Sequence, residues 1–182
     1  MVERKIEPEV ESILSLVRNK KHFLLSGGAG CGKTYSLVSL LKEIAREEPN
    51  ARIACITYTN AAALEIKNRV NMKNLHVSTI HDFLWMNISQ FQNELRELLI
   101  EMVNAPENVI VNPSEDEDFS LDSEVQIKYK EHTRLAQGEI SHDELIKLSN
   151  AMFKQYTKLC KVVSSKYNYI FVDEYQIGRA SC

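Results

Sequence analysis

Residues 27–34 read GGAGCGKT, and this stretch has the residue types needed to hold a phosphate group. It matches the pattern G-x-x-x-x-G-K-[ST], with Lys33 and Thr34 at its end. Glycines let the backbone wrap closely around phosphate oxygens, and successive N–H groups form a nest for the anion. The lysine reaches the outer phosphates, and the threonine hydroxyl binds Mg²⁺. The predicted phosphate-binding residues are Gly27, Gly28, Ala29, Gly30, Cys31, Gly32, Lys33, Thr34 and Tyr35.

The stretch YIFVDE, residues 169–174, supplies the acidic groups that would complete such a site. A buried apolar strand ending in Asp173 presents a carboxylate to a metal ion that is bound with the phosphates. Glu174, the next residue, is placed to orient or deprotonate an attacking water. Acidic pairs also end strands on solvated turns, so the pair is informative only together with the phosphate-binding loop. The two stretches together predict ATP and Mg²⁺ as cofactors, with Thr34 and Asp173 as the Mg²⁺ ligands.

Short apolar runs alternate with helical periodicities in the part of the chain that must position these residues. This alternation is typical of βαβ units and predicts an α/β fold with a parallel sheet. The expected strands are 22–26, 52–57, 76–80 and 168–173. The expected helices begin at Pro8 and span 34–47 and 61–70.

A different pattern begins near Trp85, where long amphipathic stretches replace the short apolar runs. Helical periodicity predicts one helix at 88–103 and another at 141–159, the second opened by a capping box of Ser141 and Glu144. Two strand-like pieces flank an acidic loop at 107–132. We therefore predict a mainly helical insertion within a single α/β domain.

Composition and charge argue against a strongly basic nucleic-acid-binding protein, a cysteine-ligated metal site, and a secreted or membrane-spanning protein. The chain has 182 residues, 44% of them hydrophobic and 26% charged, with a formal net charge of −3. This charge gives no overall attraction to nucleic acid or to anionic membrane, so any nucleic-acid binding must come from local groups. The four cysteines lack the paired spacing of metal ligands. No signal-peptide core and no apolar run of about 20 residues is present, which predicts a cytoplasmic protein without a membrane partner.

Two further stretches identify a family. TYTNAAALEIKNRV (57–70) and VSTIHDF (77–83), together with GGAGCGKT and VDEYQ, resemble the ordered motifs of UvrD/Rep-like DNA helicases of superfamily 1. The resemblance implies a RecA-like P-loop NTPase domain, known as 1A, built from 1–84 and 166–176. It also implies a mainly helical 1B-like insertion at 85–165. The implied activity is ATP hydrolysis coupled to translocation on single-stranded DNA and to duplex unwinding, in the 3′ to 5′ direction.

The resemblance also assigns roles to residues outside the phosphate-binding loop. Tyr58 takes the position of an aromatic residue that stacks on a base, although it fits a core aromatic equally well. Thr59 and Asn60 match residues that contact the DNA backbone. Thr79 and His81 match residues beside the DNA path, and a lone histidine without this motif would more often be structural. These five residues form the predicted DNA-binding set.

The catalytic set that the resemblance implies is Lys33, Glu174 and Gln176, the last of which senses the γ-phosphate or couples the two sites. The chain departs from the family at three places. Ala62 stands where a lysine is common, which removes a phosphate contact. Tyr35 follows GKT where an arginine is common, so adenine stacking on Tyr35 is an alternative. Residues 1–21 contain no glutamine that would read adenine.

The motifs present match only the first motor domain of the family. A second RecA-like domain would supply the arginine that stabilises the transition state, so the chain alone is expected to be inactive as a motor. Residues 177–182, IGRASC, depart from the family after DEYQ and are expected to be a non-native tail. In the RecA-like fold a later strand lies between the phosphate-loop strand and the strand at 168–173, so a gap is expected there.

Three functions remain open at this point. The first is the helicase, acting on single-stranded DNA or DNA junctions with the missing C-terminal RecA-like domain of the same protein. The second is a nucleotide-gated subunit of a DNA repair or anti-phage defence complex that works with a nuclease. The third is a P-loop nucleotide or small-molecule kinase, which would need an arginine-rich lid. Residues 85–165 contain only Arg96 and Arg134 for that purpose.

Overall fold

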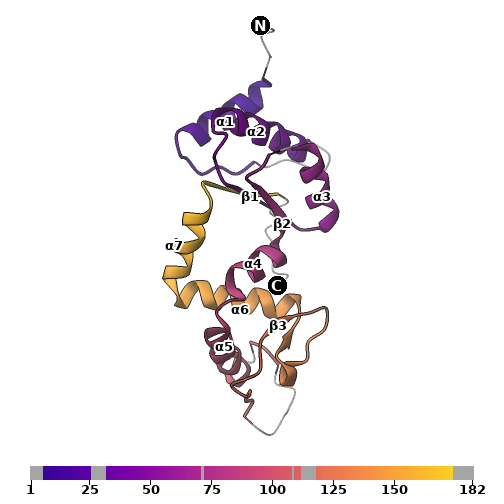
Figure 1. The fold of residues 1–182 in the computed structure, drawn as a ribbon, viewed down its shortest axis with the longest axis vertical. Coiled ribbons are helices and arrows are strands. Elements are labelled where there is room, and N and C mark those ends of the chain that lie inside the picture. Colours follow the sequence, from indigo (N-terminus) through magenta and orange to yellow (C-terminus); the bar gives the residue numbers. More distant parts are fainter. Residues whose placement is uncertain (1–5, 26–31, 71, 108, 112–117, 174–182) are drawn as a thin grey trace. The chain divides into compact units, whose positions relative to one another are not determined.

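The computed structural model describes residues 6–25, 32–70, 72–107, 109–111 and 118–173 (Figure 1). The chain forms two compact units. Unit 1 comprises Met1–Thr79 and Tyr167–Cys182, and unit 2 comprises Ile80–Lys166. Helices and a parallel sheet alternate in unit 1, which confirms the predicted α/β fold class.

Unit 1 is built around a three-stranded parallel sheet. Its strands are β1 (Ile53–Thr57), β2 (Leu75–Thr79) and β5 (Tyr169–Val172), in the order β2-β1-β5. Every residue of the central strand β1 is buried, as expected for a strand with a neighbour on each side. In this register Ile53 lies opposite both Leu75 and Tyr169, so all three strands end at the same edge of the sheet.

Three helices share a hydrophobic core with one face of this sheet. They are α1 (Pro8–Arg18), α2 (Lys33–Glu47) and α3 (Asn60–Arg69). Proline at the first position starts α1, because the missing N–H would have no partner there. α1 and α2 lie side by side (Figure 1). The core unites apolar stripes of the helices with alternate residues of the strands, among them Ile53 and Cys55 of β1 and Val77 of β2.

The expected strand at 22–26 is wrong for the residues that can be described. Residues 22–25 belong to no strand, and Ser26 lies outside the described part. Leu24 is 69% exposed, whereas Phe23 and Leu25 pack against the core. In the part of the chain that the structure describes, β5 pairs with β1 alone. The described residues 22–25 therefore alternate between exposed and partly buried positions without pairing into a ladder.

Unit 2 is mainly helical and has its own core. Its helices are α4 (Ile80–Ile88), α5 (Gln92–Asn104), α6 (His142–Gln155) and α7 (Thr157–Lys166). α4, α5 and α7 all pack against α6. A small parallel ladder joins β3 (Lys128–Tyr129) to β4 (Glu139–Ile140), with the 3₁₀ turn η1 (Leu135–Gln137) between them.

The two helices predicted for this region differ from those observed. The helix expected at 88–103 begins only at Gln92 as α5, because residues 89–91 form a break after Ile88, the last residue of α4. The Gln92 side chain stabilises this break, because its amide donates to the carbonyl oxygens of Ser89 and Ile127 at 2.7 and 3.3 Å. The helix expected at 141–159 breaks at Tyr156, between α6 and α7.

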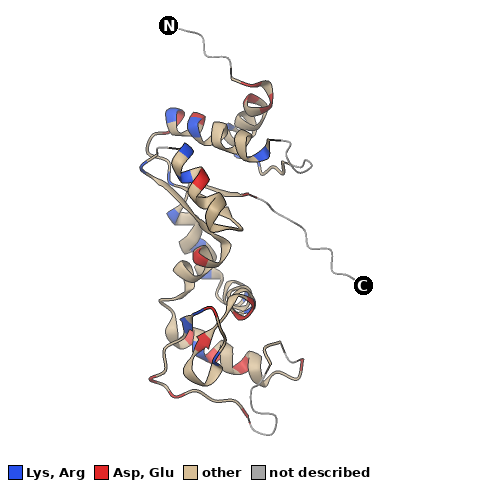
Figure 2. Cartoon of the chain, turned by 90° about the vertical axis from the view of Figure 1, so that its right-hand side faces the viewer, with Lys and Arg blue, Asp and Glu red and all other residues tan. Residues whose placement is uncertain are grey.

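The remaining predictions for this region have different outcomes. The capping box of Ser141 and Glu144 is confirmed at the start of α6. Of the two strand-like pieces expected at 107–132, the described residues contain only the two-residue strand β3. Figure 2 shows basic and acidic residues on helices of both units, in keeping with the small net charge. Among the described helices, none is long and apolar enough to cross a membrane.

Candidate functional site

The structure brings Thr34 and Asp173 together, although 139 positions separate them in the sequence. The Thr34 hydroxyl donates to the Asp173 carboxylate, with 3.3 Å between Oγ1 and Oδ2. Thr34 lies in the first turn of α2, and Asp173 directly follows β5. The Asp173 N–H donates to the carbonyl oxygen of Ile56 at 2.7 Å, which continues the ladder with β1. The helix start and the strand end therefore meet at the carboxyl edge of the sheet.

Gly32 shapes the start of α2. It is the N-cap residue and has a φ of 84°, which is the left-handed region that glycine adopts without strain. A Cβ built on Gly32 would meet nothing within 4 Å, so the backbone conformation alone requires glycine here. The N–H groups of the first helical turn form a site suited to an anion. Lys33 is the first residue of this helix.

The two oxygens fit the requirements of Mg²⁺. This ion prefers hard oxygen ligands at about 2.0–2.1 Å in octahedral geometry, in which neighbouring ligands lie about 2.9 Å apart. The separation of 3.3 Å between the Thr34 and Asp173 oxygens is close to that value. Asp173 is only 8% exposed, so its carboxylate is held in a fixed environment. Within the described ranges, no group of three or more His, Cys, Asp or Glu residues could hold a metal ion.

Several predicted site residues lie outside the described part of the chain. They are Gly27, Gly28, Ala29, Gly30 and Cys31 of the phosphate-binding loop, and Glu174 and Gln176 after β5. The expected tail, 177–182, also lies there. Their roles stay predictions.

The residues predicted to contact DNA in unit 1 gather at the same edge of the sheet. Thr57 and Thr79 end β1 and β2 and lie opposite each other in the ladder. Tyr58, Thr59 and Asn60 follow β1 directly, and Tyr58 is 67% exposed. Ligands of open parallel sheets bind at this carboxyl edge.

Thr59 also has a structural role. Its side-chain oxygen accepts a hydrogen bond from the Ala62 N–H at 3.2 Å, which makes Thr59 the N-cap of α3. The Thr57 hydroxyl in turn donates to the Thr59 carbonyl oxygen at 2.9 Å. These contacts fix the turn that presents Tyr58 to solvent.

His81 belongs to unit 2 and is buried near the start of α4. Its ring meets that of His142 edge to face, with 4.3 Å between centroids. His142 Nε2 lies 3.0 Å from the Tyr129 hydroxyl. Burial and the neighbouring His142 lower the pKa of His81, although the carboxylates of Asp82 and Asp143 oppose them. The cluster thus favours the neutral form of His81.

Cys55 occupies the middle of β1, in the core of unit 1. Burial, together with the charge of Asp173, raises the pKa of the Cys55 thiol to about 12. The thiol is therefore neutral at physiological pH and behaves as a small apolar side chain. Among the described cysteines, Cys55 and the exposed Cys160 are both free thiols.

A groove of about 460 Å³ lies along α2 in unit 1. Tyr35 lines it at the start of α2, and Ile6 and Val10 line it from the α1 side. Lys42, Arg46 and Arg69 line it together with Glu7 and Glu43, so charges of both signs face the groove. Its volume lies within the range of pockets that hold small ligands.

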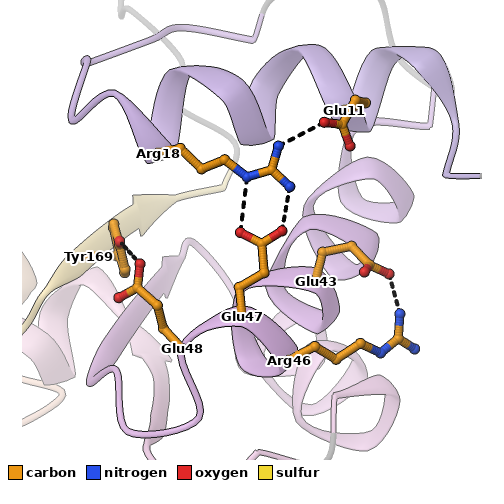
Figure 3. Close-up of polar contacts among 7 residues, drawn as sticks. All are labelled: Glu11, Arg18, Glu43, Arg46, Glu47, Glu48 and Tyr169. Atoms are coloured by element: carbon orange, nitrogen blue, oxygen red, sulfur yellow. Dashed lines mark hydrogen bonds and ion pairs between the residues drawn. The ribbon is translucent and has the colours of Figure 1, made fainter.

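A polar contact that sequence reasoning missed joins β5 to the other end of α2. The Tyr169 hydroxyl donates to the Glu48 carboxylate at 2.6 Å (Figure 3). The period of two along β5 places Tyr169, Phe171 and Asp173 on one face, but no sequence pattern pairs Tyr169 with Glu48.

Comparison with known proteins assigns the chain to a family. A family model described as an AAA domain matches residues 11–179. The chain belongs to this family. Its relatives include helicases of the UvrD/Rep type, which confirms the resemblance found in the motifs.

Three relatives show how far the similarity extends. The Gabija protein GajB of Bacillus cereus (strain HuB5-5) is 37% identical over 99 residues, which cover 50% of this chain and 14% of that protein. A probable DNA helicase II homolog of Rickettsia felis is 25% identical over 210 aligned residues, covering 89% and 32%. One subunit of an ATP-dependent helicase/nuclease of Bacillus mycoides is 43% identical over 60 residues, covering 31% and 5%. The chain thus spans less than a third of the length of each relative.

Proposed function

We propose that the chain binds ATP and Mg²⁺ at the carboxyl edge of the unit 1 sheet and forms the nucleotide-binding part of a DNA helicase motor. The contact between the Thr34 hydroxyl and the Asp173 carboxylate carries this proposal. Membership of the AAA domain family and similarity to helicases support it. In this arrangement 1–84 with 166–176 would act as domain 1A, and 85–165 as the 1B-like insertion.

Each group in the site has a distinct task. Thr34 and Asp173 would hold Mg²⁺, which neutralises the charge that develops on the phosphates during hydrolysis. The N–H groups at the start of α2 and the ammonium group of Lys33 would bind the phosphate oxygens. Glu174 would orient the attacking water, and Gln176 would sense the γ-phosphate. The base would enter the groove beside Tyr35, with the aromatic ring available for stacking.

Single-stranded DNA is the second proposed ligand. The exposed ring of Tyr58 offers a stacking surface at the same edge as the nucleotide site. Thr59, Asn60 and Thr79 would contribute polar contacts beside it, and His81 is the remaining member of the proposed DNA-binding set. Translocation in the 3′ to 5′ direction belongs to a complete motor with two RecA-like domains. Because the motifs here match the first domain only, we expect little DNA-stimulated turnover from these 182 residues.

A second candidate role is partnership with a nuclease. One relative belongs to a helicase/nuclease, and another is a Gabija protein. The same nucleotide site would then control a repair or defence complex.

The kinase alternative has little support. The arginines that a lid would need are engaged elsewhere, since Arg96 donates to the Val125 carbonyl oxygen at 3.1 and 3.2 Å. Arg134 lies 3.9 Å from the Glu139 carboxylate.

Metal-dependent nucleotide binding tests the main proposal. Fluorescence anisotropy of a labelled ATP analogue would be measured with Mg²⁺ and with EDTA. In wild type, Mg²⁺ should strengthen binding, and Thr34→Ala and Asp173→Asn should lose about tenfold or more of the affinity measured with Mg²⁺. Asp118→Asn removes an exposed carboxylate in unit 2 and should bind as wild type does. If wild type binds the ATP analogue with the same affinity in Mg²⁺ and in EDTA, the proposal is refuted.

A further inference from the structure

β5 presents a row of three side chains to the core of unit 1. Tyr169, Phe171 and Asp173 alternate along the strand and therefore share one face. The ring of Phe171 is stacked with that of Tyr169, and its centroid lies 6.3 Å from those of both Tyr169 and Phe23. The opposite face carries Ile170 and Val172, which are 44% and 49% exposed. The aromatic rings of Tyr169, Phe171 and Phe23 thus pack together on this face, and Asp173 is the next side chain along it.

Both ends of this row contact α2. Asp173 meets Thr34 in the first turn of the helix, and Tyr169 meets Glu48 directly after its last residue (Figure 3). The strand and the helix consequently run in opposite directions, with one polar contact at each end. A helix fixed at both ends cannot slide along the strand without breaking a contact.

α2 is longer than β5, and this difference in length bears on the contact between Tyr169 and Glu48. From residue 34 to residue 48 a helix rises about 21 Å. From 169 to 173 a strand spans about 13 Å. Short side chains, Thr34 and Asp173, meet at one end, and the long side chains of Tyr169 and Glu48 cover the difference at the other. The Tyr169 contact is therefore a second point, far from Asp173, at which β5 meets α2.

The beginning of β5 is also fixed laterally. The Arg52 N–H donates to Asn168 Oδ1 at 2.9 Å, and the Asn168 N–H donates to the Arg52 carbonyl oxygen at 2.7 Å. These bonds hold β5 against β1, and Tyr169 adds the contact with the α2 end. The hydrogen bond to Glu48, together with burial, raises the pKa of Tyr169 to about 12. The hydroxyl thus remains a donor throughout the neutral range.

We propose that Tyr169 is a positioning residue for the metal site, whose hydrogen bond to Glu48 sets the register of β5 along α2 and keeps Asp173 opposite Thr34. This inference rests on the proposed Mg²⁺–nucleotide site. Tyr169 acts through the strand, since its own contacts lie at the far end of α2.

The test measures metal affinity separately from nucleotide affinity in the 182-residue chain. Mn²⁺ binding at saturating ADP would be followed by electron paramagnetic resonance, and ADP binding in EDTA by anisotropy. Tyr169→Phe and Glu48→Ala should each weaken Mn²⁺ binding about three- to tenfold, with ADP affinity in EDTA changed less than about twofold. Glu48→Gln keeps an acceptor oxygen and should stay near wild type. Glu48→Ala also tests the contact should Tyr169→Phe fail to fold.

Arg18→Gln is the matched control. Arg18 donates to the carboxylate of Glu47, the neighbour of Glu48, and so joins the same helix end to α1 (Figure 3). The Arg18→Gln substitution should lower the melting temperature without changing Mn²⁺ affinity. Unchanged Mn²⁺ affinity in Tyr169→Phe and Glu48→Ala, or an equal loss in Arg18→Gln, would overturn the inference. A wild-type chain that binds neither ADP nor Mn²⁺ would instead refute the nucleotide site, and this inference with it.

Discussion

Tyr58 is the residue whose two interpretations the structure separates most clearly. From the sequence alone it fits either a core aromatic or a surface for stacking. The side chain is 67% exposed and follows a fully buried strand, so the core interpretation is wrong. The exposed ring is available for the stacking contact proposed for it.

Replacement of this ring gives a direct test at the level of one residue. Tyr58→Ala should weaken binding of a fluorescent single-stranded oligonucleotide by about 1–3 kcal/mol, the usual contribution of one stacked base. Leu64→Ala removes another exposed apolar side chain, on α3, and should have little effect. Equal losses in both variants, measured by anisotropy at one salt concentration, would contradict a specific role for Tyr58.

Residue contacts differ in how far the sequence predicts them. The motifs predicted Thr34 and Asp173 as partners because both belong to patterns with a known chemical task. No such pattern marks Tyr169 and Glu48. Their contact depends on how α2 is packed across the sheet, which periodicity does not specify. Residue types thus identified the chemistry of the site but not the contact at its far end.

Helices and strands were likewise predicted where local sequence pattern decides the structure, and missed where tertiary contacts decide it. The apolar spacing of 88–103 continues across the break at 89–91, so periodicity predicts one helix there. The Gln92 side chain stabilises the break by hydrogen bonds to Ser89 and to Ile127. The bonds to Ile127 join residues distant in the sequence, so they form only in the folded chain. The segment 22–25 has the composition of a strand, yet no described strand pairs with it.

The start of α6 offers a test at the level of one element. Ser141→Ala removes the side-chain half of the capping box and should lower the free energy of unfolding by about 1 kcal/mol. Trp85, the single tryptophan, packs against the core of unit 2 and reports this unfolding by its fluorescence in urea. Ser141→Thr retains the cap and serves as the control. Identical unfolding midpoints in all three proteins would show that the cap contributes nothing.

The effect of this substitution should depend on pH. Burial raises the pKa of Glu144, but hydrogen bonds from Ser141 and Thr133 outweigh it and leave the pKa below its ordinary value. A carboxyl group with a lowered pKa stabilises the fold above its unfolded pKa and loses that contribution as the pH falls through its folded pKa. The difference between wild type and Ser141→Ala should therefore shrink in acid. A constant difference from about pH 7 to about pH 3 would contradict this.

At the scale of the whole molecule, the described residues form two separate hydrophobic cores. The buried core residues of unit 1 come from Val10–Val77, joined by partly buried side chains of β5. Those of unit 2 come from Ile88–Leu159. Leu41 and Leu148 are fully buried members of the first and the second core. Since each core uses residues of its own unit, its stability should depend on local packing.

Truncation of one leucine in each core tests this independence. Leu148→Ala should lower the unfolding free energy reported by Trp85 by about 2–5 kcal/mol. Leu41→Ala should instead speed hydrogen exchange of the β1 and α2 amides and leave the Trp85 midpoint in place. If Leu41→Ala moves the Trp85 midpoint as far as Leu148→Ala does, the two units unfold as one.

The two faces of β5 also suggest where a spectroscopic probe can be attached. One face carries the row from Tyr169 to Asp173, whereas Ile170 points away from that row and is 44% exposed. A cysteine introduced at 170 would accept a fluorophore without touching the side chains that contact α2. Cys160, which is exposed, would first need replacement, as would Cys31 and Cys182, whereas Cys55 is buried and its thiol has a raised pKa. A dye on the back of this strand would then register strand movement during nucleotide binding while leaving the binding groups unmodified.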